Sequence, residues 1–217
     1  DHLAGAASAA PAVPAYLTRF IGREHETALL SDRLLDPGVR WITLTGPGGV
    51  GKTRLAVEAA RRALHDQPDT IQLVTFVSLF GIGDPARALE AIARRLDPET
   101  SDADPVTAIT SVINGRPALL LLDNADELIP FGSTLSALLQ IPELRRLKLL
   151  VTSRTPFNRA GESLLPLNPL PLPSGSEIAS DATAESPAVR LFIDRAEAAR
   201  LDLTFSSRDI AMIAEIC

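Results

Sequence analysis

Two hydrophobic patterns alternate along the chain: short continuous apolar runs, and longer segments in which apolar residues recur every three or four positions. A continuous apolar run of about four to eight residues predicts a strand covered on both faces, whereas the longer spacing predicts an amphipathic helix. The predicted strands are 41–45, 71–79, 118–122 and 148–152, with a short edge strand running into an extended segment within 164–173. The predicted helices are 23–35, 55–64, 85–96, 105–113, 135–139, one beginning at Pro187, and one opened by Ser206 and Asp209. This alternation indicates an α/β fold with a mainly parallel sheet.

Composition and helix-start signals predict the domain boundaries. Residues 1–16 are rich in Ala and Pro and show neither a helical nor a strand pattern, which is typical of a linker. The α/β core is expected over 17–173, followed by a polar loop over 174–186. Residues 187–217 are expected to begin a helical lid domain that this sequence leaves incomplete. Ser186-Pro187 is predicted to supply the cap and the first residue of its first helix.

The overall composition limits the class of protein. A chain of 217 residues, 46% of them apolar, can bury about 70% of the surface that its unfolded form exposes, so it can fold without disulfides or a structural metal. Its single cysteine, Cys217, and its three histidines form no zinc-binding pattern. No run approaches about 20 apolar residues, and the first residues lack the features of a signal peptide. We therefore expect a soluble cytoplasmic protein without a membrane segment.

The charge balance bears on nucleic-acid binding. The chain carries 21 basic and 27 acidic side chains, a formal net charge of −6, which argues against a general phosphate-backbone binder. Nucleic-acid binding by a part outside this sequence stays open. Four aromatic residues lack flanking basic clusters and are predicted to be core residues rather than a base-stacking surface: Trp41, Phe76, Phe80 and Phe192. Only two of the basic residues are lysines, Lys52 and Lys148.

A glycine-rich loop carries the clearest chemical motif. Residues 46–53 fit G-x-x-x-x-G-K-[ST] and lie between a predicted strand and a predicted helix, the context in which this pattern binds phosphates. Glycines let backbone N–H groups point toward an anion, Lys52 is expected to reach the β- and γ-phosphates, and the Thr53 hydroxyl to ligate Mg²⁺. The alternative is a glycine-rich turn with an unrelated lysine. The predicted phosphate-binding residues are Gly46, Pro47, Gly48, Gly49, Val50, Gly51, Lys52, Thr53 and Arg54.

Two further strands end in charged residues that suit a nucleotide site. Asp123 follows the apolar run 119–122, so it is expected at the carboxyl edge of the sheet beside the glycine loop, where it can hold Mg²⁺. A turn-forming aspartate is the alternative. Arg154 follows the strand 148–152 and is a candidate reader of the γ-phosphate, the alternative being an ordinary surface arginine.

Several ordered motifs together resemble the nucleotide-binding domain of the STAND ATPases. They are FIGRE (20–24), LTGPGGVGKTRLA (44–56), LLLLDNADEL (119–128), LLVTSR (149–154), GESLLPLNPLPLP (161–173) and SPAVRLFIDRA (186–196). Such domains are related to NB-ARC domains, and the chain most resembles the branch found in bacterial transcriptional regulators with LuxR-type or SARP-type DNA-binding domains. The resemblance covers residues 17–217. It implies a three-layer P-loop NTPase fold followed by a helical lid.

The resemblance also implies a function and further site residues. It implies an ATP/ADP switch that is closed with ADP, opens on exchange for ATP, and then self-associates. Gly46 to Thr53 would hold the phosphates, Asp123 would hold Mg²⁺, and Arg154 would be the first sensor. Ile21, Gly22 and Arg23 match a segment that lies near the base and ribose. Lid, sensor and DNA-binding domains outside this chain would be its partners, with no nucleic-acid binding by this part.

One departure from the family pattern concerns hydrolysis. Many members carry a second acid directly after the magnesium aspartate, whereas this chain has Asn124, whose neutral amide can hold a water molecule but cannot take its proton. Asp126 and Glu127 lie close by, and Asp126 is the candidate for a catalytic role. The hypothesis is slow hydrolysis, with the nucleotide serving as a switch.

Two other functions stay open on the sequence. One is a nucleotide-dependent assembly module without significant hydrolysis, in which binding energy alone selects a conformation. The other is a small-molecule phosphotransferase, which the run LLPLNPLPLP fits less well than the switch family. The preference for adenine over guanine rests on the resemblance alone, and the inducer, the output domain and the oligomeric state are not encoded in these motifs.

Overall fold

The computed structural model describes residues 13–99, 103–172, 183, 185–200 and 203–217. The chain divides into two compact units. The first is built from Glu26–Leu167 with the segment before Ala15, and the second from Ala15–His25 together with Asn168–Cys217. The predicted linker up to residue 12 and most of the predicted polar loop over 174–186 lie outside the described residues.

Within the described residues, five strands form one sheet in the first unit. They are β1 (Trp41–Thr45), β2 (Leu73–Ser78), β3 (Ala118–Asp123), β4 (Leu147–Ser153) and β5 (Glu162–Pro166). The strand order is β2-β3-β4-β1-β5, and every neighbouring pair is parallel. This arrangement confirms the predicted α/β fold with a parallel sheet. The predicted edge strand within 164–173 begins two residues earlier than expected and ends at Pro166.

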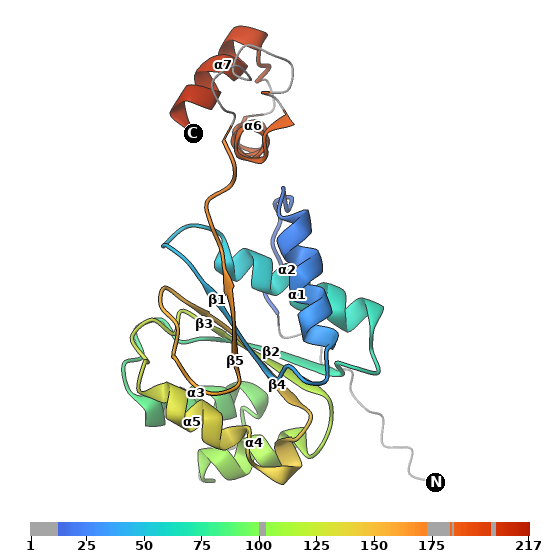
Figure 1. The fold of residues 1–217 in the computed structure, drawn as a ribbon, viewed down its shortest axis with the longest axis vertical. Coiled ribbons are helices and arrows are strands. Elements are labelled where there is room, and N and C mark those ends of the chain that lie inside the picture. Colours follow the sequence, from blue (N-terminus) through green and yellow to red (C-terminus); the bar gives the residue numbers. More distant parts are fainter. Residues whose placement is uncertain (1–12, 100–102, 173–182, 184, 201–202) are drawn as a thin grey trace. The chain divides into compact units, whose positions relative to one another are not determined.

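Helices connect β1 to β2, β2 to β3 and β3 to β4, as parallel pairing requires, and a further helix precedes β1. In the first unit these are α1 (Glu24–Leu35, which begins in the second unit), α2 (Lys52–Asp66), α3 (Pro85–Leu96), α4 (Pro105–Ile113), α5 (Phe131–Leu138) and a 3₁₀ turn over Pro142–Leu144. Figure 1 shows α1 and α2 on one side of the sheet and α3, α4 and α5 on the other, which gives three layers. Helix α5 begins four residues before the predicted segment because Phe131 is fully buried and anchors its first turn.

Side-chain alternation along β3 and β4 decides which residues face which helices. Leu120 and Leu122 of β3 pack in one cluster with residues of α3, α4 and α5, as do Leu149 and Val151 of β4. Successive strand residues point to opposite faces. The alternate positions of these two strands therefore face α2, and they include Asp123 at the end of β3 and the penultimate residue of β4.

The second unit contains α6 (Pro187–Ala199) and α7 (Ser207–Ile216). Val189, Ile213 and Ala214 form its buried cluster. Helix α7 begins with a capping box, in which Ser206 and Asp209 each bond to the backbone N–H of the other. Ser186 and Pro187 are the N-cap and the first residue of α6, as predicted, although the Ser186 hydroxyl donates to the Pro171 carbonyl at 3.0 Å and makes no side-chain cap bond to the helix.

The prediction that the aromatic residues belong to the core is confirmed for Trp41 and wrong for Phe80 and Phe192. Trp41 is 1% exposed and belongs to the core, as expected. Phe80 is 81% exposed and Phe192 is 40% exposed, so their assignment to the core is wrong. Phe80 follows β2 in a turn with Gly81 at φ 72°, which carries its side chain away from the sheet.

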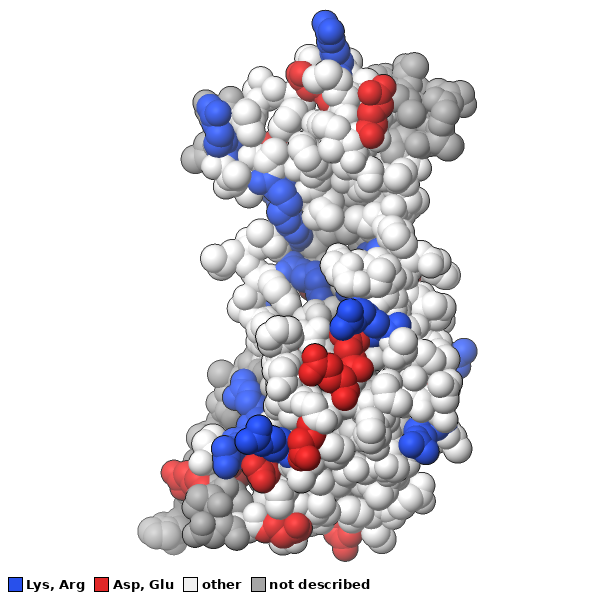
Figure 2. Space-filling view, turned by 90° about the vertical axis from the view of Figure 1, so that its left-hand side faces the viewer, with Lys and Arg blue, Asp and Glu red and all other residues white. Residues whose placement is uncertain are grey.

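Charged groups of both signs lie on the surface of the described residues. Figure 2 shows one face on which most side chains are uncharged and acidic and basic groups lie next to one another. Among the described residues, the helices are too short or too polar for any of them to cross a bilayer.

Candidate functional site

The glycine loop leads directly from β1 into α2. Gly46 has φ 149°, and a Cβ built on it would lie 2.5 Å from the Leu167 carbonyl oxygen, so only glycine fits this close approach. Gly49 and Gly51 also have positive φ. A Cβ at either of these, or at Gly48, would meet no described atom within 4 Å, so the loop backbone borders open space. The loop therefore has the room that an anion needs.

The first turn of α2 is arranged for an external acceptor. Its N-cap, Gly51, supplies no side-chain cap, and the turn contains no acidic residue. By contrast, Asp84 and Asp104 cap α3 and α4 by accepting from backbone N–H groups at 3.0 Å. The first N–H groups of a helix need acceptors, and its N-terminus attracts negative charge. The start of α2 thus suits a phosphate group.

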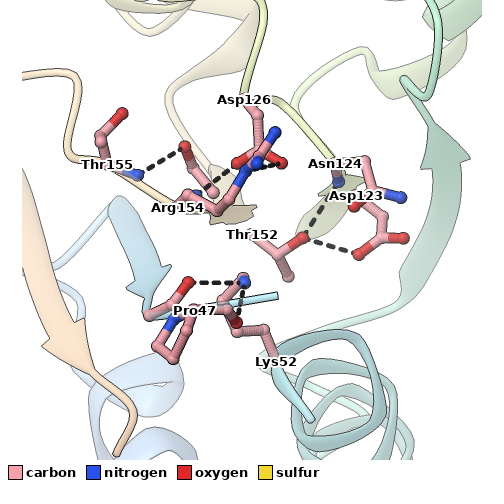
Figure 3. A network of polar contacts seen from close by, with 10 residues as sticks. Pro47, Lys52, Asp123, Asn124, Asp126, Thr152, Arg154 and Thr155 are labelled. Carbon is pink, nitrogen blue, oxygen red and sulfur yellow. Dashed lines mark hydrogen bonds and ion pairs between the residues drawn. The ribbon is translucent and has the colours of Figure 1, made fainter. Parts of the chain in front are cut away.

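Lys52 lies across the mouth of the loop. Its Nζ donates to the Gly46 carbonyl at 2.8 Å and to the Pro47 carbonyl at 3.0 Å (Figure 3). An ammonium group has three donors, so two bonds to the loop leave a third for a ligand. The loop's own carbonyls therefore hold the charge beside the space that the glycines border.

Asp123 is joined to both neighbouring elements by hydroxyl groups. Thr53 of α2 and Thr152 of β4 each donate to Asp123 Oδ1 at 2.6 Å, and Asp123 is only 5% exposed. Thr152 Oγ1 also accepts from the backbone N–H of Asn124 at 3.0 Å (Figure 3). Carboxylate and hydroxyl oxygens are the hard ligands that Mg²⁺ prefers. The donor set at Thr53 and Asp123 therefore fits the predicted metal.

Thr152 is a residue of this cluster that was not predicted. The signal was present, because Thr152 is a polar residue on the α2 face of a strand whose other positions are mainly apolar. Its partner could not be read from the sequence, since the contact depends on β4 lying between β1 and β3.

Arg154 and Asp126, two predicted catalytic residues, bind each other. Arg154 Nε lies 3.2 Å from Asp126 Oδ2, and the Arg154 backbone N–H donates to Asp126 Oδ1 (Figure 3). The Arg154 side chain is 63% exposed and that of Asp126 is 19% exposed. Asn124 is exposed and has φ 58°. The motifs predict separate roles for Arg154 and Asp126, and this pairing was not predicted.

Ile21, Gly22 and Arg23 belong to the second unit. Gly22 has φ 68°, and a Cβ on it would lie 3.0 Å from the Pro187 Cβ, so the segment packs closely against the start of α6. Ile21 lines a cavity of about 320 Å³ in the same unit, whose other lining residues are Arg19, Phe20, Arg190, Ile193, Asp194 and Glu197. The expected contacts of Ile21 to Arg23 with the base and ribose stay a prediction.

Comparison with solved structures agrees with the fold. The ORC2 protein of Aeropyrum pernix, solved in ADPNP–ADP complexes, superposes with a TM-score of 0.62 at 18% sequence identity. The superposition covers 92% of this chain and 58% of that chain. At this level of identity the likeness concerns the fold.

Sequence relatives occur in Mycobacterium tuberculosis. The protein named "Uncharacterized protein Rv0894" is 30% identical over 93% of this chain and 47% of its own length. The protein named "Putative HTH-type transcriptional regulator Rv0890c" is 31% identical over 82% of this chain and 18% of its own length. The chain thus spans about half the length of the first of these relatives and a smaller part of the second.

A family model supplies the assignment. The AAA domain model matches residues 38–159, which include the glycine loop, Asp123, Asp126 and Arg154. The match covers more than half of the chain and four of the five described strands of the parallel sheet. The chain belongs to the AAA domain family.

Proposed function

We propose that this chain is an ATP/ADP-binding switch with slow hydrolysis, and that it serves as the regulatory module of a larger transcriptional regulator. The observation that carries the proposal is the joint arrangement of an uncapped α2, an open glycine loop and the Thr53–Asp123–Thr152 cluster. Backbone N–H groups, an ammonium group and hard oxygen ligands are the groups that a nucleotide triphosphate with Mg²⁺ requires.

In this proposal each residue of the loop has a defined task. The backbone of Gly46 to Gly51 surrounds the phosphates, and Lys52 donates to them from its position on the Gly46 and Pro47 carbonyls. Thr53 and Asp123 hold Mg²⁺, with Thr152 fixing the carboxylate through its bond to Oδ1. When bound, the metal neutralises negative charge on the phosphates. These tasks concern binding and orientation, and they are the same for ATP and ADP.

Slow hydrolysis follows from the groups available to a water molecule. Asn124 cannot accept a proton, and both carboxylate oxygens of Asp126 contact Arg154. A site of this kind binds and orients a nucleotide better than it activates water. The slow-hydrolysis part of the proposal therefore rests on the weak general base.

The regulatory role rests on the relatives. One is named as an HTH-type transcriptional regulator, and this chain corresponds to only 18% of its length. An output domain and the segments that sense a signal would lie in the remainder of such a protein. Nucleotide-dependent self-association and a cytoplasmic location are part of the same proposal.

Binding and single-turnover measurements test the proposal. We expect the protein to bind MgADP and MgATP, and Lys52→Ala to weaken both by roughly 10- to 100-fold, the effect of losing a hydrogen bond from a charged donor. Arg62→Ala, which removes an exposed cation from the same helix, is the matched control and should leave both affinities within about twofold. Absence of nucleotide binding, or a preference for GDP over ADP, would contradict the proposal.

The single-turnover arm separates a slow ATPase from an assembly module. We expect ADP release from MgATP to be slow, and Asn124→Asp to increase it by placing a carboxylate where water is to be oriented. No turnover in either protein would favour the assembly module. Rapid turnover in the wild type, unchanged in Asn124→Asp, would exclude a switch that relies on slow hydrolysis.

A further inference from the structure

We infer that Asp126 sets the preference of the site between nucleoside triphosphate and diphosphate, by competing with the γ-phosphate for Arg154. The inference rests on the proposed function and adds to it a residue that determines specificity. In place of a role in activating water, Asp126 acts through the arginine that it holds.

The ion pair of Arg154 with Asp126 lies at the edge of the sheet where the glycine loop begins. In the parallel register of β1 and β4, Thr45 is opposite Ser153, so the next residues in each strand direction are Gly46 and Arg154. The first glycine of the loop and the arginine thus leave the sheet from equivalent positions on adjacent strands. An arginine at this place is available to a group bound on the loop.

Asp126 is held in place independently of its ion pair. The turn after β3 is fixed to the end of β4 by two bonds, from the Asn124 N–H to Thr152 Oγ1 and from the Ala125 N–H to the Thr152 carbonyl, both at 3.0 Å. The Asp126 Oδ1 bond to the Arg154 backbone continues this ladder. The carboxylate is therefore preorganised, and the exposed guanidinium is the partner that can move.

The physical basis is a competition between two anions for one cation. The contact between Arg154 Nε and Asp126 Oδ2 is 3.2 Å long, and the arginine side chain is 63% exposed. Exposed ion pairs contribute little to stability, so a phosphate with greater negative charge can displace the carboxylate. A diphosphate lacks the group that competes. Asp126 therefore lowers the affinity for triphosphate selectively, because it holds the arginine that the third phosphate would otherwise bind.

The decisive variant is Asp126→Asn. The amide oxygen can still accept from the Arg154 backbone N–H, whereas the negative charge that pairs with the guanidinium is lost. We expect this variant to raise the ratio of MgATP-analogue affinity to MgADP affinity by about three- to tenfold, measured by calorimetry with a non-hydrolysable analogue. Arg154→Ala should lower the ratio, and the double variant should behave like Arg154→Ala, since the carboxylate acts through the arginine.

Glu58→Gln is the matched control. It removes a carboxylate from an ion pair of similar length, 3.1 Å to Arg62 on α2, and changes the net charge equally. An unchanged ratio in Asp126→Asn, an equal rise in Glu58→Gln, or a gain that persists without Arg154 would each overturn the inference. Asp126→Ser provides the same comparison if the asparagine variant folds poorly. Failure of the wild type to bind any nucleotide would overturn the proposed function itself, whereas binding with an unaltered ratio would overturn this inference alone.

Discussion

At Gly46 the glycine loop has no room for a side chain, because a Cβ there would collide with a neighbouring backbone atom. Its φ of 149° and the 2.5 Å approach of a Cβ to the Leu167 carbonyl combine backbone strain with a steric clash. We expect Gly46→Ala to lower the free energy of unfolding by about 2–3 kcal/mol. The single tryptophan, Trp41, is buried in the adjacent strand, so its fluorescence during urea unfolding reports on this region.

Gly48→Ala provides the control for Gly46→Ala. Gly48 lies in the same loop, and a Cβ on it would meet no described atom within 4 Å. The same substitution there should change the free energy of unfolding by less than about 1 kcal/mol. Equal losses at both positions would show that the loop does not depend on the contact between Gly46 and Leu167.

The buried side chain Lys148 illustrates how a residue can serve the fold rather than the site. Its Nζ donates to the carbonyls of Asp36 and Val39, which ties β4 to the segment after α1. Burial lowers the pKa of this ammonium group, and the nearby Asp36 partly opposes the shift. Of the two lysines in the chain, Lys148 is thus structural, whereas Lys52 lies on the phosphate loop.

At the scale of elements, α7 begins with a capping box that can be tested through one hydroxyl. Ser206 Oγ accepts from the Asp209 N–H, and the Ser206 hydroxyl and backbone N–H both donate to the Asp209 carboxylate, which holds the pKa of that group below its usual value. We expect Ser206→Ala to weaken the start of α7 by about 1 kcal/mol, seen as faster hydrogen exchange of its amides. Ser186→Ala is the control, because Ser186 makes no cap bond to α6.

The same cap predicts a pH dependence. Because the pKa of Asp209 is lowered in the folded state, its contribution to stability is present above the unfolded value of 3.8 and is lost as the pH falls through the lowered pKa. Protection of the α7 amides should therefore decrease in that acidic range in the wild type. Ser206→Ala should show a smaller decrease, and an identical acid profile in both proteins would contradict the role of the hydroxyl.

Sequence patterns predicted most elements but fewer of the contacts between them. Helices 85–96 and 105–113 and strand 41–45 have the bounds that periodicity predicted, because apolar spacing and flanking Pro or Gly residues are local signals. The motif of the glycine loop, residues 46–53, is also a local signal. The bonds of Thr152 and the pair of Arg154 with Asp126 join residues 28 or 29 positions apart, and they depend on the order of the strands. A one-dimensional pattern contains no such information.

At the scale of the whole molecule, each unit has a hydrophobic core of its own. The core of the first unit joins the sheet to α3, α4 and α5, whereas the described core of the second consists of Val189, Ile213 and Ala214. Among the described residues this second core has few fully buried members, with Ile193, Phe205 and Ile210 packed against them, so each buried member is expected to contribute strongly to it. Two cores of such different size are expected to open with different free energies.

Matched substitutions of valine test this expectation. Val189 is fully buried in α6, and Val74 is 3% exposed in β2 of the first unit. Replacing either with alanine removes the same two methyl groups and should cost about 1–3 kcal/mol locally. Hydrogen exchange followed by mass spectrometry should show Val189→Ala losing protection in α6 and α7 while β3 and β4 stay protected, and Val74→Ala doing the reverse. Equal loss of protection across both units in Val189→Ala would show that they unfold as a single cooperative unit. In that case a nucleotide bound to the glycine loop would stabilise α6 and α7 as strongly as the sheet.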